Sequence, residues 1–311
     1  MMAAPIVIFA YRRPQHLKRM LESLMICEEF ADSPVIVYVD GPKSASEMSE
    51  ICQVRQVVRE LLGADAEYHF SEINRGLSQS IIDGVSAVIR RYGRAIVVED
   101  DLLLAPNFLN YMNTALNFYQ HEEKVFQISG YMFETQELDD QNAAMLLPLT
   151  VSWGWATWQR AWKCFDISAT GWQHLLSNSA LRRKFDIDGV YGYSTMLARQ
   201  MMGKRDSWAV RWYWSAFQND ALTVFPPQTL VRNLGFDGSG SHGRGFFRNF
   251  DHDQAKLTQR NIVFPKAIQV NRSNLITVKN ALRKANGGGF GSILDYLRWI
   301  VTKNLAKKLV K

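Results

Sequence analysis

Residues 95–101 read AIVVEDD, an apolar run that ends in three consecutive acids. Two further apolar runs precede it, PIVIFA at residues 5–10 and PVIVYV at residues 34–39. Apolar runs rich in β-branched residues are typical of strands buried on both faces, and segments with helical spacing separate these three. Strands that alternate with helices predict parallel βαβ units. We therefore predict an α/β fold with a mostly parallel sheet flanked by helices.

The rest of the chain is less regular. Eight of the nine tryptophans lie between residues 153 and 214, and their frequent i, i+4 spacing predicts that most are packed in the core. A last strand is predicted over residues 266–270. The three glycines at residues 287–289 predict a flexible break before a terminal helix that begins near Ser292.

The composition excludes several classes of protein. The chain has 311 residues, of which 47% are hydrophobic and 21% charged, so a disordered, collagen-like or disulfide-stapled chain is excluded. No stretch approaches the roughly 18 to 20 apolar residues of a membrane-spanning helix. The three cysteines form no CxxC pair, and the first apolar run precedes its arginines, the reverse of a secretory signal. We therefore expect a cytoplasmic protein.

The net charge of +6 is unevenly distributed along the chain. Residues 273–311 hold eight of the 36 Lys and Arg residues but only one of the 30 acids, so the remaining residues are almost neutral. A neutral body argues against binding to nucleic acid, and we expect no nucleic-acid partner.

The acids Glu99, Asp100 and Asp101 come directly after a predicted parallel strand. Open α/β sheets bind ligands at the carboxyl ends of their strands, and three adjacent carboxylates repel one another unless a cation or several donors neutralise them. Oxygen ligands of this kind suit Mg²⁺ or Mn²⁺, commonly shared with substrate phosphates. The alternative is an acidic turn that caps a helix starting near Pro106.

Other polar residues are expected at the same edge of the sheet. Asp40 follows the second apolar run, where it could bind a base or ribose or could be an ordinary turn aspartate. Arg12 and Arg13 follow the first run, where they could meet a diphosphate or form a solvated pair. Neither a GxxxxGK[ST] loop nor a GxGxxG motif follows the first run, which disfavours a P-loop NTPase and a dinucleotide dehydrogenase.

Seven segments, in this order along residues 5–243, carry a resemblance to a known family: PIVIFAYRRPQHLKRMLESL (5–24), VYVDGPK (37–43), NRGLSQSI (74–81), VVEDDLLLAPNFLNYM (97–112), SWGWATWQRAW (152–162), DSWAVRW (206–212) and LVRNLGFDGSGSHG (230–243). With them the chain resembles glycosyltransferases that use nucleotide sugars and have the GT-A fold, a Rossmann-like sheet. It looks most like bacterial sugar transferases of the N-acetylglucosaminyltransferase I type (family 13). The acids after the strand and SWGWATW are the specific elements.

The resemblance implies a donor site and a metal. The residues that would bind the donor are Arg13, Asp40, Arg75, Glu99 and Asp100. The EDD sequence is the counterpart of the family's DxD motif, and Asp101 would ligate Mn²⁺ or Mg²⁺ that bridges the diphosphate. His242, in a glycine-rich loop, would join the metal or diphosphate; an exposed turn histidine is the alternative.

The resemblance also implies a base and an acceptor site. The family's base is an acid beside a tryptophan at the start of a late helix, and Asp206, two residues before Trp208, is the best candidate. The position after that tryptophan is Ala209, which departs from the family pattern, and Glu134 and Asp220 are weaker candidates. Sugars stack on indole rings, so Trp153 and Trp208 are candidates for the acceptor site.

We divide the chain into a nucleotide-sugar-binding half (residues 1–125), an acceptor-binding and catalytic half (126–272) and a basic tail (273–311). In the tail, apolar residues recur every four positions from Ile293 to Leu309 among several lysines. Such a basic amphipathic helix suits an anionic membrane surface, and a helix docked on the body is the alternative. We therefore expect peripheral association with the inner face of the cell membrane.

The sequence thus predicts a metal-dependent, inverting hexosyl- or N-acetylhexosaminyltransferase. It would move a sugar from a nucleoside diphosphate sugar to a glycan or lipid-linked oligosaccharide in surface polysaccharide biosynthesis. One alternative is a sugar-phosphate nucleotidyltransferase, which the absence of a Gly-rich loop after the first strand disfavours. The other is an inactive sugar-binding homologue, supported by Ala209 and opposed by the intact acids.

Overall fold

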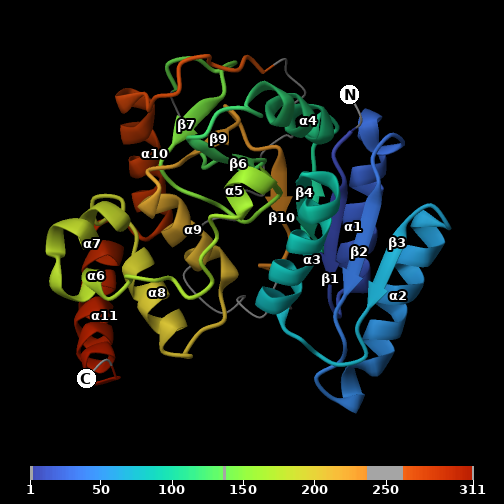
Figure 1. Cartoon of the computed structure of the whole chain (residues 1–311), viewed down its shortest axis with the longest axis horizontal. Coiled ribbons are helices and arrows are strands. Elements are labelled where there is room, and N and C mark those ends of the chain that lie inside the picture. The colour runs from blue at the N-terminus through green and yellow to red at the C-terminus, as the bar shows by residue number, and fades with distance from the viewer. Residues whose placement is uncertain (1–2, 136–137, 237–261, 310–311) are drawn as a thin grey trace.

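The computed structural model describes residues 3–135, 138–236 and 262–309 (Figure 1). The described residues form an eight-stranded sheet in the order β3-β2-β1-β4-β8-β6-β9-β7, and a separate two-stranded sheet of β5 and β10. The strands are β1 (Ile6–Ala10), β2 (Val35–Val39), β3 (Glu67–Phe70), β4 (Arg94–Glu99), β5 (Leu102–Leu104), β6 (Val125–Ser129), β7 (Met145–Leu147), β8 (Trp155–Trp158), β9 (Leu222–Phe225) and β10 (Val231–Asn233).

Parallel pairing dominates the large sheet. β1 pairs in parallel with β2 and with β4, so that Ile8 lies beside Val37 on one side and Val98 on the other. β3 extends this parallel half beyond β2, whereas β8 is antiparallel to both β4 and β6. β9 is parallel to β6, and β7 is an antiparallel edge. The predicted α/β fold with a mostly parallel sheet flanked by helices is confirmed.

Helices cover both faces of the sheet (Figure 1). They are α1 (Pro14–Met25), α2 (Met48–Leu62), α3 (Leu77–Tyr92), α4 (Phe108–Phe118), α5 (Gln159–Trp162), α6 (His174–Ser177), α7 (Ser179–Phe185), α8 (Tyr193–Met201), α9 (Trp208–Gln218), α10 (Arg272–Ala285) and α11 (Gly288–Leu309), with 3-10 turns η1 (Glu28–Phe30) and η2 (Ala45–Glu47). The alternation of side chains along a strand divides the core. Ile6 and Ile8 pack with α1, α2 and α4, whereas Val7 and Phe9 pack with α3 and α5.

Tryptophans fill much of the core in the second half of the chain. Eight of the nine are buried, as their spacing predicts, and Trp153 is half-buried. Trp155 stacks on Trp208 with ring centroids 5.0 Å apart, and Trp162 lies 5.2 Å from Trp212. These rings join β8 and α5 to α9, so the aromatic core fixes the start of α9 against the sheet.

Two predictions for the C-terminal part are wrong. Residues 266–270 form no strand, because they are irregular and α10 begins at Arg272; among the described residues the pairing nearby is an isolated bridge between Ala143 and Val263. The glycines at 287–289 do not form a flexible break, because α11 begins at Gly288 and follows α10 after a tight turn.

The terminal helix α11 docks on the body of the protein beside α6 and α8 (Figure 1). Asp295 accepts hydrogen bonds from the backbone N–H of Gly192 (3.2 Å) and from the side-chain amide of Asn286 (2.9 Å). Trp299 is only 4% exposed on the docked face, and Ala306 is fully buried there. The helix therefore uses one face to pack against the protein.

The opposite face of α11 is apolar and exposed. Four exposed residues of this face, which we name the outer stripe, are Ile293, Leu297, Val301 and Leu305, with exposed fractions between 41% and 61%. Their spacing of four places them along one side of the helix, away from Trp299. Within the described residues, no helix is both long and apolar enough to cross a membrane.

Candidate active site

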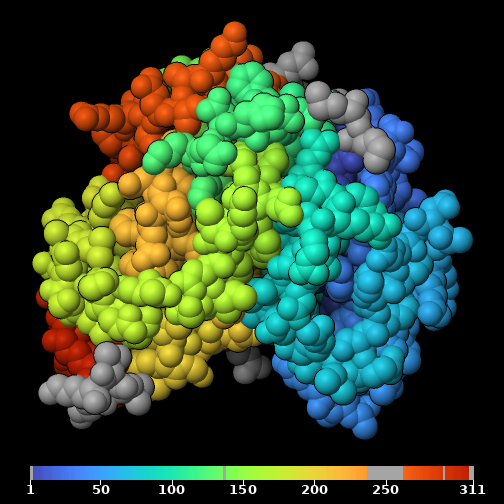
Figure 2. Space-filling model, in the orientation of Figure 1, coloured from blue at the N-terminus to red at the C-terminus, as the bar shows by residue number. Residues whose placement is uncertain are grey.

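Two adjoining hollows lie at the carboxyl ends of the parallel strands. The larger has a volume of about 510 Å³ and the smaller about 190 Å³. Both hollows are lined by Arg13, Lys43, Gly76, Leu77 and Glu99. In Figure 2 the surface is notched at its lower edge, between the cyan segment that includes α3 and the yellow segment that includes α8, and both segments line the larger hollow.

The three acids lie where the hollows join. Glu99 ends β4 and lines both hollows, whereas Asp100 lines the smaller and Asp101 the larger. The guanidinium of Arg13 is 2.6 Å from Asp100 Oδ1 and 3.0 Å from Asp101 Oδ2. Asp100 is 3% exposed, and it also accepts a hydrogen bond from the backbone N–H of Tyr11. The neighbouring strands β1 and β4 thus bring Arg13 to the acids.

The charge balance of this cluster is unfavourable. Burial, followed by the charges of Asp101 and Asp100, raises the pKa of Glu99. Burial likewise raises the pKa of Asp100, although Arg13 opposes that shift. Three carboxylates therefore share one guanidinium, and any added cation at this place would stabilise their ionised forms.

The turn between β1 and α1 is strained at this point. Arg12 has φ = 51°, a left-handed conformation that costs a residue with a side chain about 1–2 kcal/mol. Glu47 holds the turn, because it accepts hydrogen bonds from Tyr11 Oη and from Arg12, each at 2.5 Å. These bonds lower the pKa of Glu47 to about 2, with the Tyr11 bond as the first cause. Backbone strain of this kind is concentrated at functional sites.

Asp40 organises the loop that closes the smaller hollow. Its carboxylate accepts hydrogen bonds from the backbone N–H groups of Gly41 (2.9 Å), Arg75 (2.8 Å) and Gly76 (2.9 Å), and from the Asn74 amide (3.0 Å). Most of its acceptor capacity is therefore used within the chain. The side chain of Arg75 forms an ion pair with Asp83 and lies outside the described linings of both hollows.

The acid cluster fits a hard divalent cation. Its donors are all carboxylate oxygens, which Mg²⁺ and Mn²⁺ prefer, and its negative charge exceeds that of the one paired arginine. A Cβ at Gly235 would lie 2.3 Å from Asp101 Oδ2, so a side chain there would require this carboxylate to shift. Over the described ranges, no group of three His, Cys, Asp or Glu side chains forms a ready metal site, and His242 lies outside those ranges.

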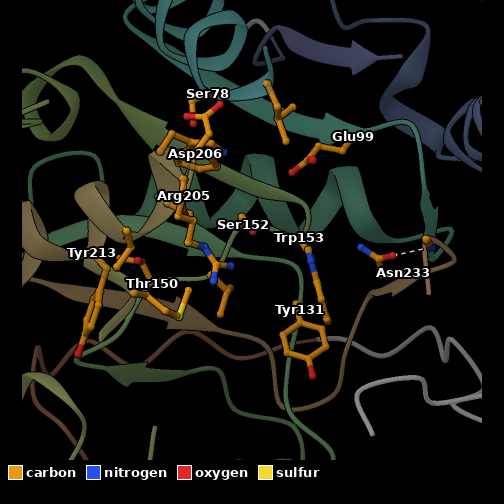
Figure 3. A pocket seen from close by; sticks show the side chains of 18 of the residues that line it. Ser78, Glu99, Tyr131, Thr150, Ser152, Trp153, Arg205, Asp206, Tyr213 and Asn233 are labelled. Carbon is orange, nitrogen blue, oxygen red and sulfur yellow. Dashed lines mark hydrogen bonds between the residues drawn. The ribbon is translucent and has the colours of Figure 1, made fainter. Parts of the chain in front are cut away.

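Asp206 lies in the larger hollow, just before α9. Its Oδ2 is 3.5 Å from the position that a Cβ at Gly76 would take, and Figure 3 shows it across the upper part of the pocket from Glu99. Gln200 accepts a hydrogen bond from the N–H of Ser207 and so fixes the start of this helix. Ala209, also in the hollow, is half-buried.

The two weaker base candidates lie elsewhere. Asp220 is exposed and forms an ion pair with Lys184 at 3.3 Å. Glu134 is exposed as well, and neither acid is among the described residues that line the hollows. Of the three candidates, the structure thus brings only Asp206 to the pocket.

The two tryptophans proposed for the acceptor differ in exposure. Trp153 is half-buried in the larger hollow, where its ring meets that of Tyr131 edge to face at 4.7 Å (Figure 3). Trp208 lines the same hollow but is only 3% exposed, since it stacks on Trp155. Its burial favours a packing role, which leaves Trp153 as the better surface for a sugar ring.

Several residues of the site were not predicted from the sequence. They are Lys43, Tyr131, Tyr191, Tyr193, Arg205 and Asn233. Lys43 and Asn233 lie in segments that carry the family resemblance, which is the signal that could have found them. Tyr131, Tyr191 and Arg205 lie in irregular segments and Tyr193 begins α8, all without a motif, so only the folded chain brings them together.

No protein-family model matches the chain. Among solved structures it is similar to mannosyltransferase PcManGT from Pyrobaculum calidifontis in complex with GDP-Man and Mn²⁺, with 12% identity, a TM-score of 0.34, and coverage of 51% of this chain and 45% of that chain. It is also similar to S. aureus TarS 1–349, with 10% identity, a TM-score of 0.42, and coverage of 74% of this chain and 60% of that chain. A third similar structure is a putative nucleotide-diphospho-sugar transferase from Desulfovibrio desulfuricans G20, with 14% identity, a TM-score of 0.33, and coverage of 54% of this chain and 69% of that chain. These likenesses are distant, so the chemistry has to be inferred from the cleft itself.

The close approach of Gly41 to residue 73 generates a prediction about the Asp40 loop. A Cβ at Gly41 would lie 2.5–2.7 Å from backbone atoms of Ile73, so Gly41→Ala must displace this loop. We expect it to lower the free energy of unfolding by about 1–3 kcal/mol, measured by urea denaturation.

Gly289→Ala is the matched control, because a Cβ there meets nothing within 4 Å and the residue lies in α11. It should leave stability unchanged or raise it by about 0.5–1 kcal/mol. Equal stability of the two variants would show that the close approach of Gly41 to Ile73 does not constrain the Asp40 loop.

Proposed function

We propose that this protein is a metal-dependent, inverting glycosyltransferase. It would transfer a hexosyl or N-acetylhexosaminyl group from a nucleoside diphosphate sugar to a hydroxyl of a glycan or lipid-linked oligosaccharide in surface polysaccharide biosynthesis. One observation carries this proposal: three carboxylates with a single paired arginine lie where two hollows join at the carboxyl ends of parallel strands. Open α/β sheets bind ligands at this edge, so the site suits a cation and the diphosphate of a donor, with the nucleoside in one hollow and the acceptor in the other.

The smaller hollow suits the nucleoside. Phe9 and Tyr38 line it and stack at 5.3 Å, which offers an aromatic wall for a base. Asp40 would act mainly by holding the loop at residues 74–76 in place for the ribose. The ammonium of Lys43 forms no ion pair with a described acid and lines both hollows, so it would attract the diphosphate.

The junction of the hollows suits the diphosphate and its metal. Asp101 would hold Mn²⁺ or Mg²⁺, with Glu99 and Asp100 adding negative charge nearby. When bound, such a cation stabilises the charge that develops on the departing nucleoside diphosphate. Arg13 would keep Asp100 and Asp101 oriented by its paired hydrogen bonds, as it does in the structure.

The larger hollow suits the acceptor and the base. Asp206 would remove the proton of the acceptor hydroxyl as that oxygen attacks the anomeric carbon opposite the leaving group. Its exposure gives it access to a hydroxyl from the open side, and Trp153 would stack on the acceptor sugar. In this arrangement residues 1–125 bind the donor, whereas residues 126–272 bind the acceptor and supply the base.

The outer stripe of α11 would hold the protein at the inner face of the cell membrane. The docked face of α11 faces the body, so the outer stripe is free to meet a lipid surface. Lys307 is exposed on the same helix and would attract anionic headgroups. A protein at the membrane would meet a lipid-linked acceptor directly.

The proposed metal and donor site predicts the effect of Asp101→Asn. In calorimetry with a panel of nucleoside diphosphate sugars, one donor should bind to the wild type only with Mn²⁺ or Mg²⁺. The variant should lose about tenfold or more in affinity for that donor, because one charged oxygen ligand is gone.

Asp65→Asn is the control, since Asp65 is exposed in a turn after α2 and lines neither hollow. Binding that ignores the metal, or that survives Asp101→Asn, would contradict the proposed site. Pyrophosphate released from a nucleoside triphosphate and a sugar 1-phosphate would instead indicate a nucleotidyltransferase.

The proposed base predicts a separation of binding from turnover. Asp206→Asn should lower kcat by about 10² to 10⁴-fold, because the general base is lost, while donor affinity stays unchanged. The rates of transfer and the calorimetric affinities together check this.

Asp220→Asn should behave like the wild type. An Asp206→Asn enzyme with normal kcat would place the base elsewhere. The anomeric configuration of the product, measured by NMR, should be opposite to that of the donor.

The outer stripe predicts binding to anionic vesicles. The protein should sediment with vesicles that contain phosphatidylserine and not with phosphatidylcholine alone. The double change Leu297→Glu and Val301→Glu should abolish this, because it places charges in the apolar face. Ile276→Glu is the control, since Ile276 is equally exposed but lies on α10. Equal sedimentation of both variants would exclude the stripe as the contact.

A further inference from the structure

Arg205 is an unpaired cation in the acceptor half of the cleft. Its side chain extends into the middle of the larger hollow, between Thr150 and Trp153 in the view of Figure 3. Within the described ranges it forms no ion pair, and its Nε is buried without a hydrogen-bond partner. Burial lowers the pKa of its guanidinium, and the charge of Arg199 acts in the same direction. Arginine nevertheless keeps its charge in proteins, so the hollow contains a half-buried positive charge without an acidic partner.

Among the described residues, two acids that line the same hollow form no ion pair with Arg205. Asp206 is adjacent in sequence, but its carboxylate forms no ion pair with Arg205, and its charge acts on Arg211. Glu99 lines the same hollow without contacting Arg205 in the described structure. The guanidinium is therefore available to a ligand.

Tyrosine rings line the same hollow, although the Tyr131 hydroxyl points away from Arg205 in Figure 3. Tyr131 is 3% exposed, and its Oη is buried without a partner in the described part of the chain. The rings of Tyr191 and Tyr193 lie 4.7 Å apart and also line the hollow. Burial raises the pKa of Tyr191, and the positive charge of Arg205 opposes that shift. Each phenol can donate one hydrogen bond.

Arg205 and the neighbouring phenol of Tyr191 form a set dominated by donors. Leaving buried donors without acceptors is costly, so the set is stabilised by a ligand that accepts several hydrogen bonds. A neutral sugar would satisfy some donors but would leave the half-buried positive charge. A carboxylate or phosphate supplies both the acceptor oxygens and the negative charge, and it fits the planar fork of an arginine.

We propose that Arg205, together with the neighbouring Tyr191, forms an anion subsite that selects an acceptor with a carboxylate or phosphate near the reacting hydroxyl. This inference rests on the proposed function, because it assigns the larger hollow to the acceptor. Arg205 directly precedes Asp206, and both side chains line the same hollow. The subsite therefore positions the acceptor hydroxyl next to the proposed base.

The test compares three small probes by ligand-observed NMR titration: methyl β-glucuronide, glycerol 3-phosphate and methyl β-glucoside. The wild type should bind at least one charged probe about tenfold to a hundredfold more tightly than the glucoside, as expected for charge-assisted hydrogen bonds. Which charged probe binds more tightly distinguishes a sugar carboxylate from a phosphate. Arg205→Gln should lose this preference, and Arg205→Lys should keep part of it.

Arg211→Gln is the matched control, because Arg211 is also half-buried but donates to the backbone carbonyls of Ser207 and Ile167. The melting temperature of Arg205→Gln should not fall, since the change removes an unpaired half-buried charge; a clear fall would indicate a structural role instead. Equal binding of charged and neutral probes, no binding of any probe, or a preference that survives Arg205→Gln would overturn the subsite. Donor affinity is measured in parallel by calorimetry. If the donor still binds in the presence of the metal, only the anion subsite fails, whereas absence of donor binding indicates that the proposed function fails.

Discussion

The contact of Arg13 with Asp100 and Asp101 is the interaction on which the rest of the site depends. Three adjacent acids at the end of a buried strand are stable only if a cation lies close by, and Arg13 is that cation in the structure. The parallel pairing of β1 and β4 fixes this contact, because it places the two strand ends side by side. The negative charge that Arg13 leaves uncompensated is what makes the cluster suitable for a divalent cation.

Several backbone segments enclose this contact. The left-handed Arg12 turns the chain between β1 and α1, and Glu47 holds that turn from the start of α2. Asp40 binds the loop before α3 from the other side. Gly235 lets a distant segment cross directly over Asp101. Residues far apart in the sequence thus enclose one group of carboxylates, which explains why strain and close packing occur together here.

The sequence predicts the first half of the protein better than the second. Apolar strands and helical spacing carry direct physical signals, so the βαβ order, the acids after β4 and Asp40 could be found. Arg205 and the tyrosines follow no period, because the segments before α8 and α9 are shaped by packing and not by a repeating face. The i, i+4 pattern of α11 indicates an exposed stripe but does not reveal that Trp299 docks on the other side. A helix that is apolar on two faces resembles an amphipathic one until its partner is known.

The aromatic core explains how unpaired donors can be tolerated at the cleft. Trp155 and Trp208 stack beneath the start of α9, and Trp212 packs against Trp162 one turn further along. Each buried aromatic side chain contributes a large apolar area, so this layer offsets the cost of the uncompensated polar groups above it. It also holds the start of α9 in place, so that the residues before it can stay directed into the hollow without bonds of their own. The packing of the aromatic core and the geometry of the cleft are therefore linked through the start of α9.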